Sequence, residues 1–199
     1  MTPRADSQAK KAHLDNVASN LQLLADLGYG DCALAVVRSG GDLVVVADAR
    51  PSTAVAAVAS TRQGEVLDRA QEPEAYEALA SGAPVEGERR RKRRGIAYVT
   101  TAYPIGAAGR DYGVVVRDLA LEVAEAPGTM EREFMAVAED LLMVLMKGPL
   151  LDVVTGESFA TNRAAGDGVI RLDADGVVRY ASPNAYKIIR NAGREGELR

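Results

Sequence analysis

CALAVVRSGGDLVVVA, residues 32–47, is the stretch of this sequence that most clearly indicates a fold. Two runs rich in small and β-branched residues, 32–37 and 43–47, flank the turn sequence SGGD at 39–42. Because glycine tolerates the reversed backbone of a tight turn, this pattern predicts an antiparallel hairpin. Arg50-Pro51 ends the second strand, since proline has no amide hydrogen to donate to a sheet.

An amphipathic helix is predicted on each side of the strand-forming region. Apolar side chains recur at spacings of three and four over residues 7–27. Residues 130–147 form the second helix, with Thr129 as a candidate N-cap and Gly148-Pro149 as its end. Its apolar face consists of Phe134, Val137, Leu141, Leu142, Leu145 and Met146.

The middle of the chain adds a short helix and more strands. Residues 74–80 suit a helix that begins after Pro73, whereas residues 52–63 are small, polar and without a regular pattern. Two further strands are predicted at 96–105 and 112–116. The whole order indicates an α+β fold, in which an antiparallel sheet carries the two terminal helices on one face.

A second pattern begins at residue 166. Two short β-branched runs flank Asp175-Gly176, a dipeptide suited to a hairpin, and a helix-prone segment follows. Only 14 residues remain after Ala185. We therefore expect a domain that starts here and is incomplete, with residues 151–165 as the linker before it, so that the chain is part of a larger protein.

Composition excludes several classes of protein. There are 28 acidic and 24 basic side chains, for a formal charge of −4, which gives no general attraction to nucleic acid or to anionic membranes. The single cysteine, Cys32, rules out an internal disulfide framework, and His13 alone leaves too few ligands for a typical zinc site. No apolar run is long enough to span a bilayer, so we expect a cytoplasmic protein without metal or membrane.

Several segments resemble known signalling domains. Residues 74–85, EAYEALASGAPV, resemble the helix and Gly-x-Pro-Val exit of GAF domains, and residues 98–105 resemble the strand that follows it. Residues 166–185 resemble the start of a PAS domain. Together with residues 21–27, LQLLADL, this order is similar to the sensory half of actinobacterial cytoplasmic GAF–PAS sensor histidine kinases of the PdtaS type.

The resemblance implies a GAF-like sensory domain at 1–150, a linker at 151–165 and a truncated PAS domain at 166–199. It also implies a kinase core outside this chain, in which ATP and Mg²⁺ act and which phosphorylates a response regulator. The helices at 7–27 and 130–147 would form a homodimer contact. We expect no catalytic residue and no cofactor within the chain itself.

Ligand binding in such a domain is expected between one sheet face and the crossover segment. Tyr98 and Thr100 share a face of the predicted strand and are candidates for the pocket wall, with Val36 opposite. Arg50 and Arg62 are candidate partners for an anion. A filled core with no ligand is the alternative.

The arginine run and Cys32 each allow two interpretations, and His13 is a further feature of note. The run RRRKRR at 89–94 predicts a solvated loop, or else an anion clamp. Binding to nucleic acid is disfavoured, because no aromatic residues for base stacking interleave the run. Cys32 is a small buried hydrophobe or a reactive thiol, and His13 is expected to be a solvated surface histidine.

The leading hypothesis is a sensory input module of a two-component histidine kinase, which binds a small ligand or partner. The alternative is a GAF-containing dimerisation or RNA-associated regulatory module with no kinase activity.

Overall fold

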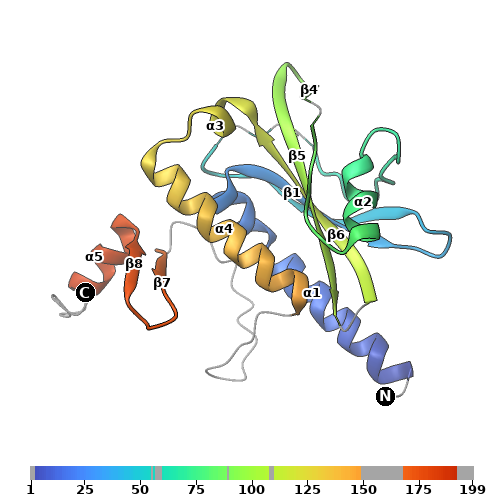
Figure 1. The fold of residues 1–199 in the computed structure, drawn as a ribbon, viewed down its shortest axis with the longest axis horizontal. Helices are drawn as coiled ribbons and strands as arrows, with labels where there is room; N and C mark the ends of the chain where they lie inside the picture. The colour runs from blue at the N-terminus through green and yellow to red at the C-terminus, as the bar shows by residue number, and fades with distance from the viewer. Residues whose placement is uncertain are drawn as a thin grey trace. The chain divides into compact units, whose positions relative to one another are not determined.

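The computed structural model of this chain describes residues 3–54, 56, 60–88, 90–107, 110–148 and 168–191. It divides into two compact units, Met1–Asn162 and Arg163–Arg199 (Figure 1). The first unit contains the sheet and four helices described below. The predicted linker at 151–165 lies outside the described residues.

The first unit is built on an antiparallel sheet with strand order β2-β1-β6-β5-β3, and β4 also pairs with β5. The strands are β1 (Gly30–Val37), β2 (Leu43–Ala49), β3 (Val85–Glu86), β4 (Arg91–Arg93), β5 (Ile96–Ala107) and β6 (Arg110–Ala120). The predicted hairpin is confirmed: Val37 lies opposite Leu43, and β1 and β2 are antiparallel neighbours. The centre of the sheet is the pairing of β1 with β6.

The two long helices pack side by side on one face of the sheet, as predicted (Figure 1). They are α1 (Pro3–Gly28) and α4 (Thr129–Lys147). The core beneath them joins apolar side chains from both helices to side chains of β1, β5 and β6, including Leu21, Leu142 and Tyr103. Burial of this apolar surface is the main force that holds the helices on the sheet.

The opposite face is covered by the crossover between β2 and β3. This segment includes residues 60–72 and the helix α2 (Pro73–Ser81), which ends at Gly82 in the left-handed conformation. Its core joins residues such as Leu67 and Ala78 to the sheet. Gly113 allows β6 to approach β1 closely, because a Cβ at this position would lie 2.2 Å from the carbonyl oxygen of Ala35.

Two expectations about elements were wrong in detail, and one short element was not expected. Thr129 does not cap α4: it is the first helical residue, and Gly128 holds the N-cap position without a side-chain hydrogen bond. A short helix, α3 (Leu121–Glu125), was not predicted. The segment at 91–93 was predicted to be part of a loop but forms β4, which is joined to β5 by a two-residue turn in which Arg94 and Gly95 both have positive φ.

The second unit contains β7 (Ile170–Leu172), β8 (Val178–Ala181) and α5 (Pro183–Asn191). The strands are antiparallel, and the turn predicted at Asp175-Gly176 is present, with Gly176 at φ 79°. The Asp173 carboxylate stabilises the turn by accepting the amides of Asp175 and Val177 at 3.0 and 2.9 Å. The order of elements is as expected, and its assignment to a PAS domain stays a prediction.

Within the part of the chain that the structure describes, no helix is both long and apolar enough to cross a membrane.

Candidate ligand-binding site

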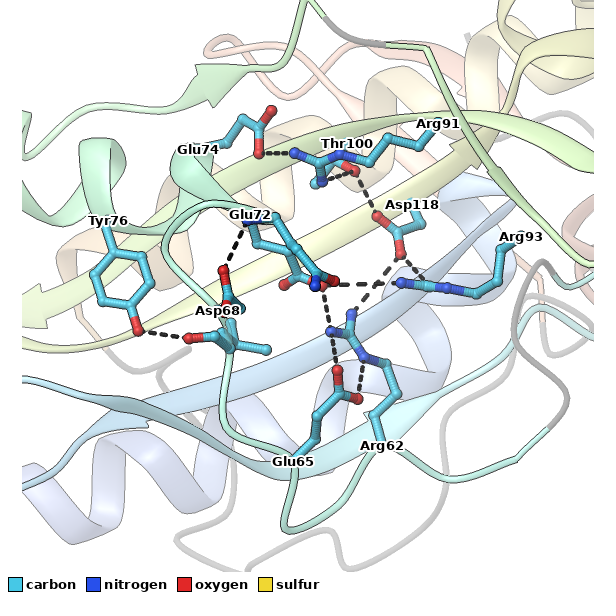
Figure 2. A network of polar contacts seen from close by, with 12 residues as sticks. Arg62, Glu65, Asp68, Glu72, Glu74, Tyr76, Arg91, Arg93, Thr100 and Asp118 are labelled. Carbon is cyan, nitrogen blue, oxygen red and sulfur yellow. Dashed lines mark hydrogen bonds and ion pairs between the residues drawn. The ribbon is translucent and has the colours of Figure 1, made fainter.

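A cluster of charged side chains lies on the sheet face opposite α1 and α4, beneath the crossover (Figure 2). We call it the arginine–carboxylate network; its members are Arg62, Glu65, Glu72, Glu74, Arg91, Arg93, Thr100 and Asp118. Strand alternation puts Thr100 and Asp118 on this face, in line with Ala102 and Val116 of the crossover-side core. Three guanidinium groups meet four carboxylates, and most of the eight side chains are buried.

Asp118 on β6 accepts hydrogen bonds from two other strands. The Thr100 hydroxyl of β5 donates to one oxygen at 2.8 Å, and Arg93 of β4 donates to the other at 2.9 Å. The Arg62 guanidinium lies 3.8 Å from the same second oxygen. An aspartate within an apolar central strand requires such partners, because an unpaired buried carboxylate is very costly.

Arg62 joins the crossover to the sheet. It donates to both carboxylate oxygens of Glu65, at 2.9 and 3.1 Å, and to Glu72 at 2.5 Å. Burial acts to lower the pKa of Arg62, but the hydrogen bonds to Glu65 and the charges of Glu72 and Asp118 outweigh it and raise the pKa. Arg62 therefore stays charged at every pH at which the protein is folded.

The side chains of β4 alternate between the network and solvent. Arg91 donates to Glu74 at 2.5 Å and to the Thr100 hydroxyl at 3.1 Å, and Arg93 stacks over the Tyr98 ring at 5.0 Å. Lys92, between them, is exposed. The interpretation as a solvated loop is thus wrong for β4, because the carboxylates of the fold neutralise its inward-facing guanidinium groups.

Glu72 occupies the N-cap position of α2 without capping it. Its carboxylate instead points into the network, where one oxygen binds Arg62 and the other, although buried, has no hydrogen-bond partner. Burial is the main cause of the raised pKa of Glu72; Arg62 acts to lower this pKa, while the charge of Asp118 adds to the increase. This carboxylate is the least satisfied group of the network.

Little free space remains within the network. A cavity of about 10 Å³ lies beside it, bounded by residues that include Asp31, Arg50, Arg62 and Asp118. This is room for about one water molecule. Among the described residues, no group of three or more His, Cys, Asp or Glu side chains is placed to hold a metal ion.

The structure brings together three of the five residues proposed from the sequence. Arg62, Tyr98 and Thr100 lie in or against the network. Arg50 lies at its margin, where it borders the small cavity and donates to Asp48 at 3.2 Å. Val36 lies on the other face of the sheet, in a groove of about 410 Å³ beside α1.

Another groove, of about 560 Å³, lies at the corner of the sheet where α3 and the start of α4 meet β5. Its walls include Ile96, Leu121 and Pro127. The groove is largely apolar and shares no residue with the network.

The carboxylates of the network were not proposed from the sequence, and Arg91 and Arg93 were singled out only as part of the charged run at 89–94. Asp118 carried a usable signal, because Arg117-Asp118 interrupts the apolar run of β6. Glu72 and Glu74 gave no such signal, since charged residues beside Pro73 also suit an ordinary exposed helix start.

The two other singled-out residues are both buried. His13 is 2% exposed, and its Nε2 donates to the Leu145 carbonyl oxygen at 2.7 Å, so the expected surface histidine instead links α1 to α4. Cys32 lies in the core beneath the helices, where burial raises the pKa of its thiol to about 12. This environment favours the interpretation of Cys32 as a small hydrophobe over that of a reactive thiol.

The network is directly connected to α4 through β6. Arg117, the neighbour of Asp118, points to the helix-covered face and lies 3.5 Å from Glu139 of α4. The Tyr103 hydroxyl of β5 donates to the same Glu139 oxygen at 2.8 Å. Adjacent residues of one strand therefore contact the crossover side and the helix side of the sheet.

A sheet with its terminal helices on one face and a helix-bearing crossover on the other, with buried polar residues beneath the crossover, defines a GAF-type sensory domain. The model of the family described as the GAF domain of histidine kinase PdtaS matches residues 5–138. The chain belongs to this family.

Known relatives agree with this assignment. The sensor histidine kinase PdtaS of Mycobacterium tuberculosis H37Rv is 33% identical over 190 residues, and that of Mycolicibacterium smegmatis is 30% identical over 191 residues. Each match covers 94% of this chain but 38% of the relative, so the chain spans about two fifths of their length. A solved sensor region of a sensor histidine kinase superimposes with a TM-score of 0.70 at 31% identity, covering 96% of this chain and 66% of that one.

Proposed function

We propose that this chain is the sensory input module of a histidine kinase, and that the arginine–carboxylate network is where it receives its signal. The observation that carries the proposal is the adjacency of Arg117 and Asp118. Asp118 belongs to the network, and Arg117 contacts Glu139 of α4.

Because the network consists of ion pairs, it can change its arrangement more easily than a packed apolar core can. A buried ion pair contributes little net stability compared with apolar packing, because desolvation offsets the attraction. A ligand or partner that binds one arrangement of these charges better than another shifts the population between the arrangements. Movement of Asp118 would alter the position of Arg117, and with it the contact with Glu139 on α4.

The two helices would transmit this change through a homodimer. Met143 and Val144 of α4 are 38% and 49% exposed, which leaves apolar surface on the side of the helix away from the core. Pairing of α1 and α4 with the same helices of a second copy would give a symmetric four-helix contact. This arrangement would let a small helix displacement reach whatever follows α4.

The catalytic steps would take place in a kinase core beyond this module. The relatives are named sensor histidine kinases, and they are longer than the region that matches this chain. In this proposal the core uses ATP and Mg²⁺ to phosphorylate its own histidine and then a cytoplasmic response regulator.

An RNA-associated role has less support. Arg91 and Arg93, which an RNA-binding loop would present to phosphates, are bound to carboxylates of the same chain.

The proposal is tested by measuring histidine autophosphorylation of the full-length kinase that contains this module. Arg117→Met removes the contact between β6 and α4 while leaving the network and the kinase core intact. We expect the basal rate to change at least about threefold, because a coupling of ~1 kcal/mol corresponds to roughly a fivefold change. Lys92→Ala, an exposed change on β4, is the control. Unchanged rates in Arg117→Met and in a kinase lacking residues 1–148 would contradict the proposal.

A further inference from the structure

We infer that the network carboxylates form a binding site for an organic cation of the guanidinium class, and that Arg91 and Arg93 occupy this site in the resting protein. The inference rests on the proposed sensory function and adds the ligand class to it. The carboxylates are those of Glu72, Glu74 and Asp118, and we call the positions of the two guanidinium groups the inner and outer sockets.

The inner socket binds two nitrogens of the planar Arg91 guanidinium group. One nitrogen donates to Glu74 at 2.5 Å, and the other donates to the Thr100 hydroxyl at 3.1 Å. This two-nitrogen arrangement selects a planar fork, which an ammonium group does not provide.

The outer socket holds Arg93 by charge and by an aromatic surface. Arg93 donates to Asp118 at 2.9 Å, and a second nitrogen lies 3.8 Å from Glu72. The guanidinium carbon lies 5.0 Å from the centre of the Tyr98 ring. A cation over an aromatic face with carboxylates beside it is a frequent way to recognise organic cations.

The carboxylates are more firmly fixed than the two arginines. Asp118 lies on β6, which pairs with strands on both sides, and Glu74 lies in the first turn of α2. Arg91 and Arg93 lie on a three-residue strand that pairs only with β5. Moving the two arginine side chains out of the network therefore requires less rearrangement than moving the carboxylates. A ligand that replaces the arginines beside these carboxylates must carry positive charge.

The exposed fraction of each side chain indicates how a ligand could replace the two arginines. The side chains of Arg91 and Arg93 are 15% and 29% exposed, whereas that of Asp118 is 4% exposed. The arginines thus enter the sockets from the solvent side and can swing outward by rotation of their side chains. Buried carboxylates left behind without a partner are strongly destabilising, so the vacated sockets favour another cation.

Charge balance and an unused acceptor also favour a cation. The network has four carboxylates and three guanidinium groups, so the carboxylates outnumber the cations by one. Glu72 is 7% exposed, and its Oε2 atom is buried and has no hydrogen-bond partner. This oxygen is available to a donor that the chain itself does not supply.

The experiment compares agmatine, which carries a guanidinium group, with sodium phosphate at the same ionic strength. Binding to the 199-residue chain is measured by titration calorimetry and by the change in Tm. The Arg91→Ala/Arg93→Ala variant empties both sockets, and Arg90→Ala/Lys92→Ala removes the same charge from exposed positions of the same run. Because the resting arginines compete with the ligand, emptying the sockets should tighten agmatine binding about tenfold or more. The control should bind agmatine as the wild type does.

Equal agmatine affinity in the two double variants would overturn the inference, as would stabilisation by phosphate in place of agmatine. If Arg91→Ala/Arg93→Ala does not fold, the wild type is titrated with agmatine while the Nε resonances of its arginines are followed by NMR. We then expect the Arg91 and Arg93 resonances to move toward those of free arginine, and unchanged resonances at saturating agmatine would overturn the inference. A different ligand that regulates the full-length kinase would contradict the ligand class alone, whereas kinase activity independent of the module would contradict the proposed function.

Discussion

At the residue scale, the two glutamate partners of Arg62 have pKa values shifted in opposite directions, although Arg62 acts to lower both. Glu65 is partly exposed, and the hydrogen bonds from Arg62 lower its pKa. Glu72 is buried, and for this residue the cost of burial exceeds the attraction of Arg62, so its pKa is raised. Two carboxylates that bind the same guanidinium should therefore affect the pH dependence of stability in opposite directions.

Glu72→Gln should gain stability relative to the wild type as pH rises from 4.5, the ordinary value of this group, toward neutrality. A raised folded-state pKa means that the wild type loses stability as Glu72 ionises, and glutamine removes this loss. The free energy of unfolding is measured by urea denaturation of both proteins between about pH 4.5 and pH 7. A difference that stays constant or falls across this range would contradict the raised pKa.

Glu65→Gln is the matched control, because it removes a carboxylate from the same arginine. A lowered pKa gives stability that is present above 4.5 and is lost as pH falls through the folded-state value. The difference between Glu65→Gln and the wild type should accordingly be flat from about pH 5.5 to pH 7. It should change only at lower pH, where the wild type loses its advantage.

At the element scale, local patterns predicted the long elements well. The hairpin of β1 and β2 and the helices α1 and α4 follow from turn residues and apolar periodicity, which are properties of neighbouring residues. β4 could not be predicted this way. Its residues repel one another in isolation, and only carboxylates on α2 and β6 make an extended strand favourable.

The candidate site was predictable only in part, for the same reason. Tyr98 and Thr100 could be placed on one face because alternation within a strand is local. Their partner Asp118 is brought to them by the pairing of β5 with β6, in which Thr100 lies opposite Asp118. Val36 was assigned to the wrong face, since its own strand gives no indication of which side the long helices cover.

Helix α4 provides a test of the proposed homodimer. Met143→Lys/Val144→Lys places two charges on its exposed apolar surface, away from the buried Leu142 and Leu145. Charges within a dimer contact should weaken association by at least about tenfold, and sedimentation analysis measures the change. Glu122→Lys changes net charge by the same amount on exposed α3 and should leave association unchanged. A wild-type chain that is monomeric at about 100 µM would contradict the homodimer.

At the scale of the whole molecule, the two units differ greatly in how much they bury. The first has an apolar core on each face of its sheet. In the described residues of the second, only Ala181, Ser182 and Ala185 are buried, while Leu172 and Ile188 are more than half exposed. With so little surface buried among its described residues, we expect this part of the second unit to have little stability of its own.

Hydrogen exchange should therefore separate the two units. Amides of β1 and β6 should exchange only through global unfolding, which for an ordinary domain costs about 5–15 kcal/mol. Amides of β7 and β8 should exchange roughly 10³-fold faster or more, through local opening. Mass spectrometry of peptides from 30–37 and 170–181 measures both. Equal protection would show that the second unit is stabilised as strongly as the first.

The central pairing of β1 with β6 also constrains how the protein is made. β1 leaves the ribosome before β6, and β6, which completes its pairing, emerges only after α2 and β5 have been synthesised. Until then β1 and β2 form an isolated hairpin, which is marginally stable in water. Pairing between strands so distant in sequence slows folding and leaves apolar strands open to aggregation. The nascent chain should accordingly depend on chaperones up to the synthesis of β6.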